Sequence, residues 1–338
     1  MNRTDASTTK LVICVWHPFS EWRPKPAVAE AIRGRWPQMR VVHLPNYDNL
    51  PQELPDTDIF IGFSIRAEQL KAAKQLKWVH STAAGVAQLM YPELRDSGIL
   101  VTNASGIFST PMAEHTMGLI LALARNFPDT VRFQDQSTWS QQQIWDKPQR
   151  LIEINGQILL IVGFGSIGRE LARRARSFDM RVWGVTRSGR GDSTLSEKIV
   201  PASQLDDVLP QADYVVIATP ETLETTNANQ LFNALRLQRM KPGARLINLG
   251  RGSLLDETAL IRALEGGALG GAALDVTSVE PLPPESPLWK TPNLFITPHN
   301  SAISERLWER ETALLVDLLE RWFTGKEMTN VVDFARGY

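Results

Sequence analysis

The sequence predicts an α/β protein with two Rossmann-like, doubly wound parallel-sheet domains, the second inserted into the first. Short apolar runs alternate with helical stretches along most of the 338 residues, as in parallel sheets covered by helices. A glycine-rich turn over residues 163–168 follows one such run and opens a helix, yet it lies near the middle of the chain. The last predicted helix is an amphipathic stretch over residues 303–323, and we expect this helix to belong to the N-terminal domain.

The first, discontinuous domain is predicted to comprise residues 1–104 and 300–338. Its predicted strands cover residues 11–15, 40–43, 59–64 and 78–81, with a helix over residues 27–35. The one cysteine, Cys14, cannot form an internal disulfide. Its place in an apolar strand favours a small buried core residue over a reactive thiol.

The inserted domain is predicted to comprise residues 105–299. A helix over residues 110–126, with Pro111 in its first turn, leads into it. The Gln- and Trp-rich stretch over residues 133–145 predicts a surface excursion rather than low-complexity disorder. The predicted strands cover residues 158–162, 181–185, 214–217, 244–248, 272–274 and 294–296.

The glycine-rich turn predicts a dinucleotide-binding site in the inserted domain. Gly163 permits a tight turn, Gly165 lets the backbone approach a pyrophosphate, and Gly168 lets the helix pack close to the strand. The helix N-terminus then offers unpaired N–H groups and a partial positive charge to the phosphates. A purely structural glycine turn is the alternative, and the flanking strand, helix and second strand favour nucleotide binding.

The residues after the second strand of this domain favour NADP(H) as the cofactor, with NAD(H) possible. An NAD site usually has Asp or Glu at this point, whereas this chain has Thr186, Arg187 and Ser188. A guanidinium can bind a 2′-phosphate in bidentate fashion, and the two hydroxyl groups can add donors. The alternative is a solvated loop of Gly, Ser and Arg.

Polar side chains that follow three later strands predict the chemistry. Arg251 can hold a 2-oxo acid by its carboxylate, and His299 can deliver or remove the proton at the carbonyl oxygen. Glu280 can orient His299 and stabilise its charged form. In open α/β sheets these positions lie at the edge that binds ligands. The set predicts hydride transfer to a 2-oxo acid.

Composition predicts neither a nucleic-acid nor a membrane partner. The net charge is −1, with 43% hydrophobic and 22% charged residues, which suits two ordinary soluble domains. Residues 1–10 lack the apolar region of a targeting signal, so a cytoplasmic location is the expectation. His17, His43 and His80 lack metal-ligand spacing, and we predict no metal site.

Seven motifs together resemble the D-isomer-specific 2-hydroxyacid dehydrogenase family over essentially the whole chain, particularly its NADPH-dependent glyoxylate/hydroxypyruvate reductase-type members. The motifs are Ser-Thr-Ala-Ala-Gly-Val (81–86), Thr-Asn-Ala-Ser-Gly (102–106), Met-Ala-Glu-His (112–115), Gly-Phe-Gly-Ser-Ile-Gly (163–168), Asn-Leu-Gly-Arg-Gly (248–252), Ala-Leu-Asp-Val (273–276) with Glu-Pro (280–281), and Thr-Pro-His (297–299).

The resemblance implies roles for particular residues. Arg251, Glu280 and His299 would be catalytic, and backbone N–H groups of Ala84, Gly85 and Val86, with Arg251 and His299, would bind the substrate. The cofactor contacts implied are Gly163, Phe164, Gly165, Ser166, Ile167, Gly168, Thr186, Arg187, Ser188, Thr219, Pro220, Thr225, Leu249, Gly250, Asp275 and His299. Asp275 would contact the carboxamide side of the nicotinamide. The family also implies a homodimer formed mainly by the coenzyme domains.

Some features depart from the family pattern or leave alternatives open. Ala83 and Ala87 replace the Gly and Asp of many relatives, and Asn300 and Ser301 follow the histidine where small apolar residues are common. A transcriptional co-regulator of the same fold that senses NAD(H) is the alternative function. Glyoxylate, hydroxypyruvate, phenylpyruvate and branched 2-oxo acids all remain candidate substrates. His115 is interpreted as a structural or domain-packing residue, and Trp139 or Trp145 could border a substrate pocket.

Overall fold

The computed structural model describes residues 5–147, 151–221 and 230–337, and the chain forms two compact units. The first unit comprises residues 1–108 and 303–338, and the second comprises residues 109–302. The second unit is thus inserted into the first along the chain. The boundaries predicted after residues 104 and 299 fall slightly earlier in the sequence, because α5 begins only at Ser109 and hydrogen bonds hold residues 300–301 to the second unit.

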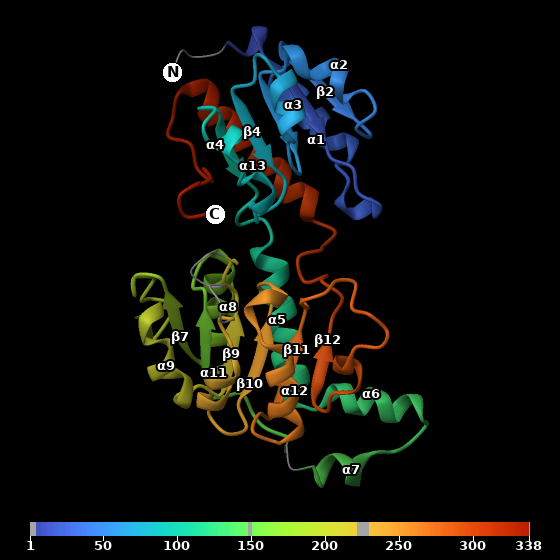
Figure 1. Ribbon diagram of the computed structural model, residues 1–338, viewed down its shortest axis with the longest axis vertical. Coiled ribbons are helices and arrows are strands. Elements are labelled where there is room, and N and C mark those ends of the chain that lie inside the picture. The colour runs from blue at the N-terminus through green and yellow to red at the C-terminus, as the bar shows by residue number, and fades with distance from the viewer. Residues whose placement is uncertain (1–4, 148–150, 222–229, 338) are drawn as a thin grey trace. The chain divides into compact units, whose positions relative to one another are not determined.

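The first unit contains a five-stranded parallel sheet with strand order β2-β1-β3-β4-β5 (Figure 1). Its strands are β1 (Lys10–Cys14), β2 (Arg40–Leu44), β3 (Ile59–Gly62), β4 (Trp78–Ser81) and β5 (Leu100–Asn103). Its helices are α1 (Pro26–Arg35), α2 (Leu50–Glu53), α3 (Ala67–Ala72), α4 (Pro92–Arg95) and α13 (Leu307–Thr324). The order reverses between β1 and β3, which is the point where such sheets usually bind ligands.

Alternate residues of β1 enter two different cores, so the sheet is covered on both faces. Leu11 and Ile13 pack in a cluster with residues of α1 and α13. Val12 and Cys14 pack in a second cluster with residues of α2 and α4. Burial raises the pKa of the Cys14 thiol to about 12, which agrees with a core residue rather than a reactive thiol.

The second unit contains a seven-stranded parallel sheet with strand order β12-β11-β10-β9-β6-β7-β8 (Figure 1). Its strands are β6 (Ile158–Val162), β7 (Arg181–Thr186), β8 (Lys198–Pro201), β9 (Tyr214–Ile217), β10 (Arg245–Asn248), β11 (Gly271–Leu274) and β12 (Leu294–Ile296). Its helices include α5 (Ser109–Ala124), α6 (Phe127–Asp135), α7 (Gln141–Trp145), α8 (Ser166–Arg176), α9 (Leu205–Val208), α11 (Ala234–Arg239) and α12 (Glu257–Glu265). Alternate residues of β6 again enter separate cores, one with α5 and α8 and the other with α9, α11 and α12.

The structure corrects several details of the predicted elements. The strands β5 and β8 were not predicted. The helix predicted over residues 110–126 ends at Ala124, because Asn126 has a left-handed backbone with φ of 53°. The stretch predicted as a surface excursion contains α7 and the end of α6. The last helix begins at Leu307 rather than at residue 303, after a turn in which Leu307 N donates to Ser304 O.

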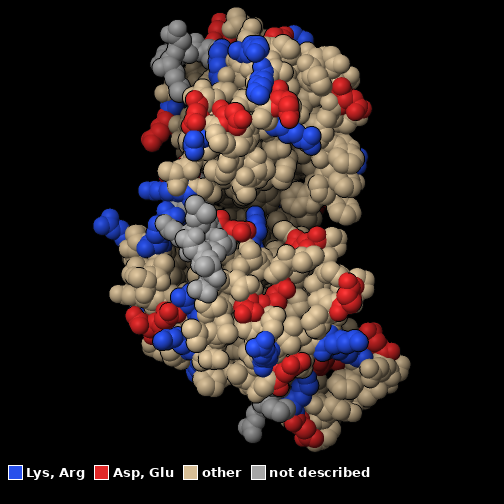
Figure 2. Space-filling view, in the orientation of Figure 1, with Lys and Arg blue, Asp and Glu red and all other residues tan. Residues whose placement is uncertain are grey.

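Charges of both signs are mixed over most of the face drawn, and one group of Lys and Arg side chains gathers at its left edge, at mid-height (Figure 2). Among the described residues, every helix is either too short or too polar to cross a lipid bilayer.

Candidate active site

The glycine-rich turn of the second unit is shaped by contacts that exclude side chains. Gly163 has φ of 103°, and an added Cβ would lie 2.4 Å from the Ala218 carbonyl oxygen. A Cβ on Gly168 would lie 2.5 Å from the Gly163 carbonyl oxygen. These two glycines therefore let the turn close tightly and let α8 pack against β6, as predicted from the sequence.

Gly165 has the opposite environment and leaves room for a ligand. It is the N-cap residue of α8 and, having no side chain, cannot cap this end of the helix with one. A Cβ added to Gly165 would meet none of the described heavy atoms within 4 Å. The backbone at Gly165 thus leaves space beside the N-terminus of α8, whose N–H groups carry a partial positive charge that suits the pyrophosphate of a dinucleotide.

The end of β7 presents an arginine where an NAD site usually has a carboxylate. Thr186 donates from Oγ1 to the Arg190 carbonyl at 3.0 Å, and Arg187 and Ser188 are exposed. The next carboxylate, Asp192, accepts from the Thr194 hydroxyl and N–H at 2.5 and 2.9 Å, and these bonds lower the pKa of Asp192. This carboxylate is therefore engaged within its own turn. Thr225, another predicted cofactor contact, lies outside the described residues.

Arg251 lies in a loop held by its own backbone and by Asn248. The Asn248 side chain accepts from Gly250 N and donates to the Arg251 carbonyl, both at 3.0 Å. Gly252 packs so closely that an added Cβ would lie 2.0 Å from the Thr277 carbonyl carbon. The exposed Arg251 guanidinium donates one hydrogen bond, to the Gly250 carbonyl at 2.7 Å. Its other N–H groups can bind a carboxylate from solvent.

Glu280 and His299 form the hydrogen-bonded pair that the sequence predicts. His299 Nδ1 lies 2.7 Å from Glu280 Oε2, and Glu280 Oε1 accepts from Thr277 N at 3.1 Å. The His299 side chain is 49% exposed, so its Nε2 is accessible to a substrate. His299 has φ of 49°, and its N–H donates to the Asp275 carbonyl at 2.9 Å. A carboxylate at Nδ1 fixes the ring orientation and stabilises the charged ring.

The Asp275 carboxylate holds the loop that carries His299. Asp275 is 2% exposed, and its Oδ1 accepts from Thr297 Oγ1 at 2.7 Å and from Asn300 N at 3.1 Å. Its Oδ2 accepts from Ser301 N at 3.2 Å. These bonds make Asp275 a positioning residue for the histidine loop, and its predicted contact with the nicotinamide stays a prediction.

His115, interpreted from the sequence as a structural or domain-packing residue, takes part in the same network. His115 Nε2 lies 3.0 Å from Thr297 Oγ1 and 3.7 Å from Asp275 Oδ1. Burial lowers the pKa of His115 more than the nearby Asp275 charge raises it, so the surroundings favour the neutral ring. Asn248 and Thr297 were not singled out, because only the alignment of β10, β11 and β12 brings their side chains to one edge.

The substrate loop predicted in the first unit has unsatisfied N–H groups. Three consecutive carbonyl groups of the loop are occupied: Ala83 O accepts from Ala104 N (3.1 Å), Ala84 O from Asn103 Nδ2 (2.9 Å) and Gly85 O from Gln88 Nε2 (3.2 Å). Among the described residues, the N–H groups of Ala84, Gly85 and Val86 have no acceptor. Adjacent unsatisfied donors suit an anion such as a carboxylate.

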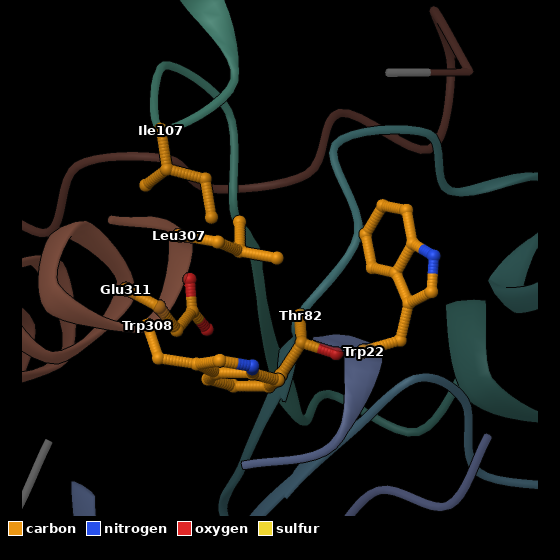
Figure 3. Close-up of a pocket in the computed structure, with 6 residues that line it drawn as sticks. All are labelled: Trp22, Thr82, Ile107, Leu307, Trp308 and Glu311. Atoms are coloured by element: carbon orange, nitrogen blue, oxygen red, sulfur yellow. The ribbon is translucent and has the colours of Figure 1, made fainter. Parts of the chain in front are cut away.

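A buried network supports the strand that precedes this loop. His80 of β4 lies 2.8 Å from Thr102 Oγ1 and 3.0 Å from Glu311 Oε1, and both His80 and Glu311 are almost fully buried. Figure 3 shows the Glu311 carboxylate at a small cavity of about 10 Å³, which is also lined by Trp22 and Thr82. The network ties β4 to β5 and α13 within the first unit.

Comparisons with known proteins agree with this geometry. Residues 117–301 match the family described as "D-isomer specific 2-hydroxyacid dehydrogenase, NAD binding domain". A glyoxylate reductase from Thermofilum pendens is 36% identical over 266 residues, which cover 75% of each chain. The chain belongs to the D-isomer-specific 2-hydroxyacid dehydrogenase family. It is therefore an oxidoreductase with a nicotinamide cofactor.

Solved structures of the same family extend the similarity to the whole chain. A family member from Aeromonas salmonicida has 34% identity and a TM-score of 0.79, covering 97% of this chain and 99% of that one. An NADPH-dependent glyoxylate/hydroxypyruvate reductase from Sinorhizobium meliloti, solved with NADP and sulfate, has 26% identity and a TM-score of 0.79. The alignment with it covers 98% of this chain and 100% of that one.

Replacing Gly252 by alanine should damage the site of this dehydrogenase without removing a functional side chain. The new Cβ must separate the Arg251 loop from Thr277, so we expect kcat/KM to fall about tenfold or more. The Gly34→Ala variant is the control, because a Cβ on Gly34 meets nothing within 4 Å. Steady-state kinetics of both variants test this, and a Gly252→Ala enzyme within twofold of wild type would contradict it.

Proposed function

We propose that this dehydrogenase reduces small 2-oxo acids, such as glyoxylate or hydroxypyruvate, to D-2-hydroxy acids and prefers NADPH as the reductant. The observation that carries the proposal is the 2.7 Å pair of His299 and Glu280 in the same unit as the exposed guanidinium of Arg251. The relative named glyoxylate reductase and the structural neighbour solved with NADP support it.

Different residues of this chain bind the substrate carboxylate and transfer the proton. When bound, the reduced nicotinamide supplies a hydride to C2. Arg251 and the N–H groups of Ala84, Gly85 and Val86 bind the substrate carboxylate. The protonated His299 gives the carbonyl oxygen its proton, so that the C=O group becomes CH–OH. Glu280 stabilises the imidazolium before that transfer.

The cofactor is held by the carboxyl edge of the seven-stranded sheet. The pyrophosphate binds at the N-terminus of α8, to the turn formed by Gly163, Phe164, Gly165, Ser166, Ile167 and Gly168. Thr186, Arg187 and Ser188 bind the 2′-phosphate. The loops with Thr219, Pro220, Leu249 and Gly250 line the rest of the cofactor, and Asp275 contacts the nicotinamide carboxamide. The room at Gly165 and the absence of a carboxylate directly after β7 support this assignment.

The alternative of a transcriptional co-regulator is not favoured. The similar proteins reported above are named as reductases or dehydrogenases. A co-regulator would bind the dinucleotide without steady turnover of any 2-oxo acid, so kinetics distinguish the two functions directly.

Replacing His299 by alanine tests the proposed proton donor. We expect kcat to fall by about 10²-fold or more, because the carbonyl oxygen loses its acid. NADPH affinity, measured by the cofactor fluorescence, should change by less than about threefold, since the glycine-rich turn is intact. Full turnover in the variant would rule out this role for His299.

Replacing Arg187 by alanine tests the cofactor preference. The KM for NADPH should rise about tenfold or more while the KM for NADH changes little, because only NADPH carries the 2′-phosphate. Arg181→Ala is the matched control: this exposed arginine at the start of β7 pairs with Glu197. Equal effects of Arg187→Ala on the two cofactors would contradict the assignment.

We also propose a homodimer formed by the second unit, in a cytoplasmic protein. Large apolar side chains on α6, on α7 and between these helices are exposed to solvent: Phe127 and Val131 at 53%, Trp139 at 87% and Trp145 at 60%. Exposed apolar patches of this kind mark association surfaces, and tryptophan is a frequent anchor of such interfaces.

The double variant Val131→Ser, Trp139→Ser should weaken the dimer. We expect its dissociation constant, measured by sedimentation, to rise by about 10²-fold or more. Phe178→Ser, which changes an exposed aromatic residue just after α8, should leave the association unchanged. A wild-type protein that sediments as a monomer at all concentrations would refute the proposal.

A further inference from the structure

The exposed aromatic residues of the first unit gather at one edge of its sheet. Trp16, Phe19, Tyr47 and Phe63 are 45%, 67%, 37% and 49% exposed. Trp16 and Phe19 follow β1, Tyr47 follows β2, and Phe63 follows β3. Among the described residues of this unit, the one other large apolar side chain that is exposed is Val331. We call these four residues the aromatic edge.

The aromatic edge coincides with the ligand-binding position of the sheet. Cys14 of β1 aligns with Gly62 of β3, and Gly62 aligns with Ser81 of β4. The residues that follow these three strands therefore leave the sheet side by side at its carboxyl edge. The strand order reverses between β1 and β3, and such reversal points bind ligands in open α/β sheets.

Hydrogen bonds connect the aromatic edge to the loop that we propose to bind the substrate carboxylate. Gln88 Nε2 donates to the Phe63 carbonyl at 3.1 Å and to the Gly85 carbonyl at 3.2 Å. Ser81 Oγ also donates to the Phe63 carbonyl, at 3.0 Å. One side-chain nitrogen thus bridges the Phe63 loop and the Gly85 loop. A substrate whose carboxylate lies at Gly85 has its C3 substituent within reach of Phe63.

Most polar groups beside the aromatic edge already contact other groups of the first unit. The Arg23 guanidinium lies 5.6 Å from the Trp16 ring centre, and it donates to the carbonyl groups of His17 and Pro18. Tyr47 has a hydrogen bond with the Trp16 backbone, and burial raises the pKa of its hydroxyl. Arg66 supplies the remaining positive charge near Tyr47. The surface therefore offers aromatic rings rather than hydrogen-bond partners.

We propose that the aromatic edge selects 2-oxo acids with a planar apolar substituent at C3, an aryl group as in phenylpyruvate. This inference rests on the proposed reductase function. Within the class of 2-oxo acids, it replaces glyoxylate and hydroxypyruvate by aryl 2-oxo acids as the preferred substrates. An aryl ring can pack against Phe63 and Trp16 and remove apolar surface from water. Glyoxylate has no substituent to place there, and hydroxypyruvate has only a hydroxymethyl group.

A substrate panel tests the proposal with the wild-type protein. NADPH oxidation is followed with phenylpyruvate, 4-methyl-2-oxopentanoate, glyoxylate and oxaloacetate. We expect kcat/KM for phenylpyruvate to exceed that for glyoxylate about tenfold or more, with 4-methyl-2-oxopentanoate between them. Equal or higher kcat/KM for glyoxylate overturns this inference alone. A higher kcat/KM for the dianionic oxaloacetate than for phenylpyruvate also overturns it. That result would indicate that the charge of Arg66, rather than the aromatic rings, selects the substrate. No turnover of any 2-oxo acid overturns the proposed function itself.

Variants of Phe63 show whether the aromatic edge causes the preference. In Phe63→Ala, the ratio of kcat/KM for phenylpyruvate to that for glyoxylate should fall about tenfold, and in Phe63→Leu by less. Phe178→Ala is the matched control, because Phe178 is 44% exposed and lies in the second unit before β7. Trp16→Ala provides the same test if Phe63→Ala does not fold. An unchanged ratio in a folded Phe63→Ala or Trp16→Ala enzyme overturns the proposal.

Discussion

Close contact between backbone segments at the carboxyl edge of the seven-stranded sheet is the constraint on which the site depends. A Cβ on Gly163 would lie 2.4 Å from Ala218 O, one on Gly250 would lie 2.7 Å from Thr219 O, and one on Gly252 would lie 2.0 Å from Thr277 C. Real Cβ atoms do not approach so closely. The loops after β6, β9, β10 and β11 can therefore form one continuous layer only because these positions lack side chains.

Side-chain hydrogen bonds then fix the positions of the loops in this layer that carry Arg251 and His299. Asn248 holds both sides of the Arg251 loop, while Asp275 holds the segment after β12 that carries His299. His299 has a left-handed backbone, a conformation that costs about 1–3 kcal/mol and persists only where surrounding contacts enforce it. The hydrogen bonds thus hold a strained backbone conformation that orients the His299 imidazole. Such a fixed orientation is expected of a preorganised catalytic group.

The sequence predicts every interior strand of the two described sheets, but only β2 and β12 of their four edge strands. The strands predicted over residues 78–81, 214–217 and 294–296 match β4, β9 and β12, because their apolar runs end in clear turn residues. The two strands that were not predicted, β5 and β8, are both edge strands with short apolar runs. Arg251, Glu280 and His299 could be proposed from motifs. The contact between His115 and Thr297 could not be predicted, because it depends on how the chain folds around the sheet.

In the proposed function the two units bind anions by the same physical means, which separates anion binding from the selection of the ligand. In the second unit the N-terminus of α8 offers backbone N–H groups next to Gly165, and in the first unit the N–H groups of Ala84, Gly85 and Val86 have no acceptor in the part of the chain that the structure describes. Backbone donors bind any phosphate or carboxylate regardless of what else the ligand carries. We propose that discrimination between ligands comes from side chains beside these donors, namely Arg187 in the second unit and the aromatic edge in the first. Since neither set supports a core, both can change without loss of the fold.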